Sequence, residues 1–195
     1  MFTGIIQTIG KIKSIQGAEF CFCVNANNFL AEVKIGDSIA VCGVCLSVTE
    51  VNSNCFKADV SLETLKCSIL GDLQAGSRVN LEKSLRLNQG VDGHLVSGHV
   101  DGVAEIIEVL ESGNSTIFRI SVSENLVKYI AKKGSISVDG VSLTVNNIEN
   151  KTGIFSVNIV PQTLLSTTFS DLKVGAKVNL EVDIIARYLE QLSKI

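Results

Sequence analysis

Two histidines, His94 and His99, are the side chains of this chain best suited to move protons near neutral pH. They lie five positions apart in the stretch HLVSGHVDG. Residues five apart on a strand point to opposite faces, so a metal ion shared by the two rings is not expected. One exposed histidine and one packed histidine is the simpler alternative.

The cysteines could offer thiol or metal chemistry, since Cys42 and Cys45 form a CxxC pair. Redox CxxC pairs stand at a helix N-terminus, whereas this pair lies in a strand-like pattern. A structural zinc site needs a second ligand pair, and neither Cys21-Phe-Cys23 nor the histidines have the usual spacing. We therefore expect reduced thiols that pack as small hydrophobic side chains, and no metal. All the cysteines lie in the first 67 residues: Cys21, Cys23, Cys42, Cys45, Cys55 and Cys67.

The carboxylates are separated along the chain, as Asp59, Glu63, Asp139 and Asp183 illustrate. They form no DxD or HExxH motif, and the chain has no Walker A, GxSxG or GxGxxG motif. A phosphate-tethered cofactor is therefore not indicated. We expect a mostly neutral ligand held by backbone amides, hydroxyl groups and apolar walls.

The composition is that of a globular protein, with 46% hydrophobic and 19% charged residues among 195. Lys and Arg number 17 against 20 Asp and Glu, so the net charge of −3 provides no basic field for nucleic acid. The apolar runs are too short to cross a bilayer, and the start MFTGIIQTIGK does not resemble an export signal. We expect a soluble, cytoplasmic protein with neither nucleic-acid nor membrane partners.

An internal repeat divides the chain in two. IAVCGVCLSV at 39–48 aligns with ISVDGVSLTV at 136–145, and VNLE occurs at both 79–82 and 178–181. Residues 1–4 align with residues 95–98, so the copies begin at equivalent points. We predict two domains, 1–94 and 95–183, followed by a separate segment, 184–195.

Hydrophobic residues alternate with polar ones in most of each copy, which predicts five or six short strands closed into a small antiparallel barrel. Within 136–145 the phase slips at Asp139-Gly140, and we interpret this slip as a bulge or kink. Two segments have helical spacing instead. One is 125–134, ending at Gly134, and the other is 183–195, with Asp183 as its N-cap and an apolar face suited to self-association.

The two copies differ at positions that carry chemistry. Cys45 aligns with Ser142 and Ile5 aligns with His99, so an ionisable ring replaces an aliphatic side chain. Three further pairs differ: Cys42 and Asp139, Glu63 and Gln162, Ser84 and Asp183. A protein that binds two copies of one molecule and treats them differently would show this pattern, and so would drift after an old duplication.

Taken together, these motifs resemble the riboflavin synthase family over essentially the whole chain. The likeness rests on MFTGII, GVCLSV, SLETL at 61–65, HLVSGHVDG, KKG at 132–134, DGVSLTV, PQTL at 161–164 and the VNLEVD ending. The resemblance implies an all-β protein of two tandem six-stranded antiparallel Greek-key barrels plus a C-terminal α-helix. It also implies a homotrimer whose active site is shared between neighbouring subunits, with possible association with lumazine synthase.

By this resemblance, the reaction is a dismutation of two 6,7-dimethyl-8-ribityllumazine molecules without a cofactor. One molecule gives four carbons to the other, which yields riboflavin and 5-amino-6-(D-ribitylamino)uracil. The resemblance places one ligand in each barrel. The first-barrel pocket would comprise Gly4, Ile5, Ile6, Cys45, Leu46, Ser47, Asp59, Val60, Ser61, Leu62, Glu63 and Thr64. The second would comprise Gly98, His99, Val100, Ser142, Leu143, Thr144, Asn158, Ile159, Val160, Pro161, Gln162 and Thr163.

The resemblance also suggests roles in catalysis. Lys133 would reach a neighbouring subunit's ligand, and Phe2 would form an aromatic wall. The remaining candidates are Cys45 and Ser47 beside the first ligand, His99 and Thr144 for proton transfer, and Asp183 as a supporting charge.

The chain departs from the family pattern at two positions. Cys42 replaces a common asparagine and weakens any polar role there. Asp92 replaces a frequent glycine in the turn between the domains. Two other classes of protein remain as alternatives, namely a non-catalytic lumazine- or flavin-binding relative and a purely structural duplicated barrel.

Overall fold

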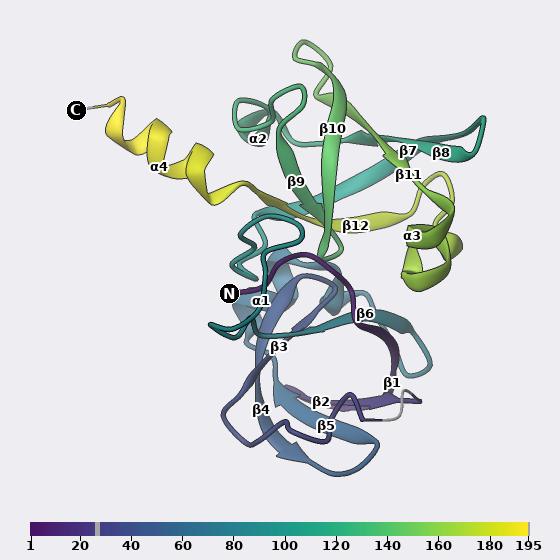
Figure 1. The fold of residues 1–195 in the computed structure, drawn as a ribbon, viewed down its shortest axis with the longest axis vertical. Helices are drawn as coiled ribbons and strands as arrows, with labels where there is room; N and C mark the ends of the chain where they lie inside the picture. Colours follow the sequence, from purple (N-terminus) through teal and green to yellow (C-terminus); the bar gives the residue numbers. More distant parts are fainter. Residues whose placement is uncertain (26–27, 195) are drawn as a thin grey trace.

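The structure is a computed structural model that describes residues 1–25 and 28–194. Two closed six-stranded antiparallel barrels dominate it, as Figure 1 shows. The strand order of the first is β1-β2-β5-β4-β3-β6, and the second repeats it as β7-β8-β11-β10-β9-β12. The predicted fold class is confirmed. The domain boundaries at 94 and 183 stay a prediction.

The first barrel contains β1 Thr8–Gln16, β2 Glu19–Val24, β3 Ser38–Val41, β4 Val44–Val51, β5 Cys55–Asp59, α1 Leu62–Cys67, the 3-10 helix η1 Ile69–Gly71 and β6 Arg78–Lys83. The second contains β7 Gly102–Ser112, β8 Ser115–Ser121, α2 Glu124–Val127, β9 Ser135–Val138, β10 Val141–Glu149, β11 Ile154–Ile159, α3 Pro161–Ser166, the 3-10 helix η2 Thr168–Asp171 and β12 Lys177–Val182. The helix α4 Ile184–Leu192 follows.

Strand alternation gives each barrel its own core. In β2, Phe20, Phe22 and Val24 are buried while the residues between them are only half-buried. Phe22 stacks on Phe56 with ring centroids 5.0 Å apart. Complete burial of such a side chain contributes about 1.5–3 kcal/mol, so the apolar face of each strand holds its barrel closed.

The interpretation of Asp139-Gly140 as a bulge or kink within a strand is wrong, because these residues form a hairpin turn between β9 and β10. Both have positive φ, 48° and 79°, as a type I′ turn requires. Cys42 and Gly43 form the equivalent turn between β3 and β4, with φ of 46° and 80°. Cys42 of the CxxC pair is therefore a turn residue, while Cys45 lies on β4.

The helix predicted over 125–134 is also wrong in extent, since α2 covers only Glu124–Val127. The chain turns at Lys133, whose φ is 69° and whose N–H donates to the Val145 carbonyl. This bond draws the segment back toward the barrel before a longer helix can form. The C-terminal helix is confirmed as α4, with the Asp183 side chain accepting from the Ile185 N–H at 2.9 Å.

The helices α1 and α3 were not predicted from the sequence. Ser61 caps α1 by accepting from the Thr64 N–H, and Pro161 is the first residue of α3. Their lengths of six residues leave too little periodicity to detect. None of the helices in the described part of the chain is long and apolar enough to span a membrane.

Not all cysteines are reduced thiols, because Cys23 and Cys55 form a disulfide. The two residues stand directly opposite each other on β2 and β5, with their Cα atoms 4.0 Å apart. Strand register creates this pairing, and spacing along the chain does not reveal it. Cys21, Cys42, Cys45 and Cys67 are free thiols.

The two barrels meet through reciprocal asparagine contacts from the VNLE repeats. The Asn80 side chain donates to the Asp139 carbonyl at 2.9 Å and accepts from the Thr168 N–H at 2.8 Å. The Asn179 side chain donates to the Cys42 carbonyl at 2.8 Å and accepts from the Ile69 N–H at 2.7 Å. These buried bonds, each contributing about 1 kcal/mol, fix the orientation of one barrel against the other.

Candidate functional site

The N-terminal segment of each copy lies against the opposite barrel. Phe2 and Val96 pair as a two-residue bridge between the segments, with N···O distances of 2.7 and 3.1 Å. Beyond the bridge, the Gly4 carbonyl accepts from the Ser142 N–H at 2.8 Å. The Gly98 carbonyl accepts from the Cys45 N–H at 2.9 Å. The segments have therefore exchanged partners.

This exchange corrects the predicted grouping of the pockets. Gly4 to Ile6 were assigned with Cys45, and Gly98 to Val100 with Ser142, whereas the structure pairs them the other way round. Aligning two repeats identifies equivalent positions in each copy. It does not show which copy a terminal segment contacts, because either choice preserves the symmetry.

Both exchanged contacts require glycine. Gly4 has φ of 76°, and a Cβ added to it would lie 2.6 Å from the Ser142 Cβ. Gly98 has φ of 83°, and its Cβ would lie 2.5 Å from the Cys45 Cβ. Only a residue without a side chain allows this backbone approach. The glycines therefore set how closely each segment packs on Cys45 or Ser142.

Two buried carboxylates hold the exchanged segments in place. Glu82 accepts from the N–H and hydroxyl of Thr3, both at 2.7 Å, and from the Gly4 N–H at 3.0 Å. Glu181 accepts in the same way from the N–H and hydroxyl of Ser97, at 2.6 and 2.7 Å, and from the Gly98 N–H at 3.0 Å. Burial raises the pKa of Glu82, and its bonds from residues 3–5 oppose the rise. The VNLE repeat was the sequence signal for both residues.

His94 forms a polar contact with Ser142 of the second-barrel group. Its ring Nδ1 lies 2.7 Å from the Ser142 hydroxyl, and its backbone N–H donates to the Thr3 carbonyl at 3.1 Å. Burial lowers the pKa of His94, while the charges of Asp183 and Glu181 oppose this shift. A neutral ring can accept the hydroxyl proton, which is how a histidine activates a serine oxygen.

His99 received more weight than His94 in the sequence analysis, but its side chain is exposed. Its backbone carbonyl accepts from Arg187 Nη2 at 3.1 Å. It borders a cavity of about 320 Å³ together with Ser97, Tyr188 and other residues of α4. A similar cavity of about 240 Å³ lies beside Ile5, the aligned residue of the first copy. The burial of the two histidines thus matches the simpler alternative, one exposed and one packed.

The remaining first-barrel candidates lie on β4, β5 and α1. Val48 pairs with Ala58, so Ser47 and Asp59 stand one position beyond this pair on neighbouring strands, and both are exposed. Cys45 is half-buried beside Gly98. The α1 segment follows with polar and apolar side chains, namely Val60 buried, Thr64 half-buried, and Ser61, Leu62 and Glu63 exposed.

The second barrel repeats this arrangement. Val145 pairs with Val157, so Thr144 and Asn158 stand one position beyond it, and both are exposed. Ser142 is half-buried against Gly4. The residues that follow include Ile159 buried, Thr163 half-buried, and Val160, Pro161 and Gln162 exposed.

Three predicted residues stand apart from these exposed groups. Phe2 is fully buried between the barrels against Ala40, Val96 and Cys45, so it packs the interface rather than facing an open pocket. Asp183 caps α4. Lys133 is exposed on the loop before β9.

The repeated geometry agrees with comparisons with known proteins. The lumazine binding domain matches the chain twice, at residues 3–84 and 97–183. The riboflavin synthase of Actinobacillus pleuropneumoniae is 48% identical over 193 residues, covering 98% of this chain and 89% of that protein. The chain belongs to the riboflavin synthase family. The riboflavin synthase of Bacillus subtilis is 42% identical over 191 residues, covering 97% of this chain and 88% of that protein.

Membership of the riboflavin synthase family confirms the resemblance drawn from the motifs. Among solved structures, LumP complexed with 6,7-dimethyl-8-(1'-D-ribityl) lumazine matches with a TM-score of 0.81 and 23% identity. This match covers 93% of the present chain and 99% of LumP, and it shows the shared fold. The first matched domain begins at residue 3 and the second at residue 97, so each includes the exchanged segment of its own copy. The helix α4 lies outside both matches.

Proposed function

We propose that this chain catalyses the reaction for which its riboflavin synthase relatives are named. Two 6,7-dimethyl-8-ribityllumazine molecules bind, and one transfers a four-carbon unit to the other. The products are riboflavin and 5-amino-6-(D-ribitylamino)uracil, and no cofactor takes part. The observation that carries the proposal is the pair of similar but chemically unequal sites, one built on Cys45 and Gly98 and the other on Ser142 and Gly4.

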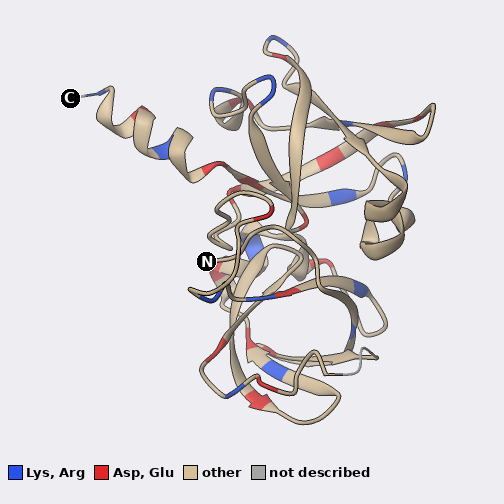
Figure 2. Ribbon diagram, in the orientation of Figure 1, with Lys and Arg blue, Asp and Glu red and all other residues tan. Residues whose placement is uncertain are grey.

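The chemistry of the substrate fits groups of this kind. A neutral heterocycle with a polyol chain needs hydrogen bonds and apolar walls, which the exposed polar groups and buried strands provide. Lys and Arg are interspersed with Asp and Glu over both barrels (Figure 2), in keeping with a neutral ligand.

We assign different roles to the two sites. Transfer requires a base for an acidic ring methyl and a nucleophile or polar group that activates the partner ring. In the second site, His94 and Ser142 form a base and hydroxyl pair at 2.7 Å, supported by the Asp183 charge. In the first site, Cys45 and Ser47 face the ligand, with His99 reaching it on the exchanged segment.

The proposal includes a homotrimer with active sites between subunits. The helix α4 exposes Ile185, Tyr188, Leu189 and Leu192, each 60–65% accessible in the single chain. An apolar stripe of this kind indicates a protein interface. Lys133, exposed on the second barrel, then reaches the ligand of a neighbouring subunit.

We further propose that the chain acts in the cytoplasm and associates with lumazine synthase through the shared pigment. Co-purification of the two proteins from cell extract tests the association. A fraction containing this chain alone would contradict it.

Incubating the protein with the lumazine and no cofactor tests the activity. Formation of riboflavin supports the proposal, whereas binding without turnover indicates a non-catalytic carrier, and no binding indicates a structural role. His99→Ala and Cys45→Ala variants test the roles of these residues. Full turnover by either variant would exclude the role assigned to it and leave the reaction itself intact.

A further inference from the structure

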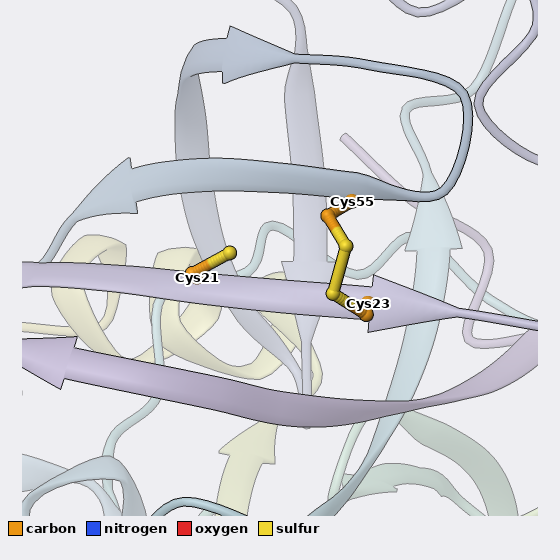
Figure 3. A group of neighbouring side chains, drawn as sticks. All are labelled: Cys21, Cys23 and Cys55. Carbon is orange, nitrogen blue, oxygen red and sulfur yellow. A yellow bond between two sulfur atoms is a disulfide. The ribbon is translucent and has the colours of Figure 1, made fainter.

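Three cysteines share the outer face of the first barrel, away from the proposed ligands. Because Phe20 and Phe22 of β2 point into the core, Cys21 and Cys23 point outward. Cys55 stands opposite Cys23 on β5. Figure 3 shows the Cys23–Cys55 disulfide joining the two strands, with Cys21 beside it. The three Sγ atoms all lie within 4.8 Å of one another.

We propose that these three thiolates bind one soft metal ion, such as Zn²⁺ or Cd²⁺, when the disulfide is reduced. Thiolate ligands select soft cations. A Zn–S bond of about 2.3 Å places three coplanar sulfurs about 4 Å apart. Cys21 Sγ already lies within 4.8 Å of both other sulfurs. The bonded sulfurs of Cys23 and Cys55 are closer together than this spacing, and after reduction side-chain rotation separates them.

The surroundings of the cluster offset the charge of such a complex. Three thiolates and one divalent cation carry a net charge of −1. Lys57 on β5 is directly opposite Cys21, and Lys11 on β1 is directly opposite Cys23, so both ammonium groups belong to the same face. Lys57 also contacts Glu19 and Glu50, at 3.3 and 3.0 Å, which leaves Lys11 as the main counter-charge.

Formation of the site is a balanced exchange. A dithiol reductant breaks the Cys23–Cys55 bond, supplies two electrons and two protons, and closes into its own disulfide. Cys23 and Cys55 become thiols. The metal ion then displaces three thiol protons to solvent and forms three metal–sulfur bonds without changing its oxidation state.

The cluster is separate from the substrate groups on β5. Cys55 begins this strand and Asp59 ends it, so about 13 Å of extended chain separates them. The metal therefore joins β2 to β5 as the disulfide does, and it replaces that link in a reducing compartment. Metal binding is then a way to stabilise the first barrel under reducing conditions.

Anaerobic titration of the full-length chain with Cd²⁺ tests the site, after reduction with a dithiol and removal of the reductant. The measurement is thiolate-to-cadmium charge-transfer absorption in the ultraviolet. We expect one equivalent to bind to the reduced chain and none at this site in the oxidised chain. Cys21→Ser removes one ligand and should weaken binding at least about tenfold, whereas Cys67→Ser, a free cysteine on α1, should not.

Equal Cd²⁺ affinity in the wild type and Cys21→Ser, or equal binding by oxidised and reduced protein, would overturn the proposal. Loss of binding in Cys67→Ser alone would also overturn it. Circular dichroism of each variant distinguishes misfolding from the loss of a ligand. Cys21→Ser leaves the Cys23–Cys55 pair in place.

Discussion

At the scale of single residues, the pair formed by His94 and Ser142 is the contact with the most direct chemical consequence. Burial keeps His94 neutral at a lower pH than an exposed histidine. In the tautomer that carries its proton on Nε2, the His94 Nδ1 accepts the proton of the Ser142 hydroxyl, which lies 2.7 Å away. In the first copy Cys45 aligns with Ser142, and its backbone N–H bonds the Gly98 carbonyl as the Ser142 N–H bonds that of Gly4. The two sites therefore present different nucleophilic atoms at equivalent places.

Ser142→Ala should reduce riboflavin formation by about 10²–10⁴-fold, the usual contribution of an activated group in proton transfer. Ser53→Ala, an exposed serine in the loop between β4 and β5, is the matched control and should leave turnover unchanged. Initial rates with the lumazine measure both. Full activity of Ser142→Ala would remove the hydroxyl from the mechanism.

The pH dependence of turnover should reflect the protonation of His94. Because burial lowers its pKa, the neutral ring persists below the ordinary histidine value of about 6.5, and the acid limb of the rate should fall below that pH. His94→Gln should lower the rate and remove this limb. The pH dependence of kcat for both proteins checks it, and an unchanged limb in the variant would assign the titration to another group.

Folding stability should depend on pH through Asp139. It should fall as the pH rises, whereas the rate of turnover falls as the pH drops. Burial raises its pKa to about 7, against the bond that its carboxylate accepts from the Asn179 N–H. A raised native pKa means that folding stability is fully present below about 4 and is lost as pH rises toward 7. At about 1.4 kcal/mol per pH unit, the loss is at most about 4 kcal/mol.

Asp139→Asn should remove this loss. Asparagine can keep the same accepting bond and tolerates the positive φ at this turn. Urea denaturation at several pH values between 4 and 8 compares the variant with the wild type at one protein concentration. A parallel decline in both proteins would show that Asp139 is not the titrating group.

At the scale of elements, the exchanged N-terminal segments connect packing to the proposed sites. Each segment is held by a carboxylate of its own copy, Glu82 or Glu181, while its glycine carbonyl bonds the opposite barrel. The segment thereby packs Ile6 on the core of the second barrel, or Val100 on the core of the first. Its position depends on the absence of a side chain at Gly4 and Gly98.

Gly98→Ala should destabilise the fold by about 2–5 kcal/mol, combining left-handed strain with overpacking against Cys45. Gly36→Ala is the control, because Gly36 has a positive φ of 90° and open space around it. It should lose only the strain, about 1–2 kcal/mol. Denaturant midpoints measure the difference, and equal losses would mean that the contact with Cys45 is not tight.

At the scale of the whole molecule, the duplication explains why the two barrels are related by symmetry. The helix α4 breaks that symmetry. The reciprocal contacts of Asn80 and Asn179 join the barrels about a pseudo-twofold axis, and the turns at Gly43 and Gly140 meet at this axis. The helix α4 has no counterpart in the first copy. Arg187 pairs with Asp101, and Glu190 contacts Lys128 and Tyr129, so α4 is tied to the second barrel. In Figure 1 its C-terminal end projects outward, which suits the proposed contact with another subunit.

Mixing two inactive variants tests the shared site between subunits. Cys45→Ala disables the first barrel and Ser142→Ala the second, so each homotrimer has low turnover. If each site joins barrels of neighbouring chains, co-refolded mixtures should regain roughly a quarter of wild-type activity by random assembly. No recovery in a mixture shown by mass to contain both chains would place each site within one chain.

The sequence by itself determined the repeat, the barrel class and the family, because strand alternation and repeated motifs are local patterns. It also indicated Asp183 as the cap of α4. Only the tertiary structure decided that Gly4 packs on Ser142 and that Cys23 faces Cys55. Such pairings depend on which strands and segments become neighbours, and residues far apart in the chain leave no periodic signal of their contact.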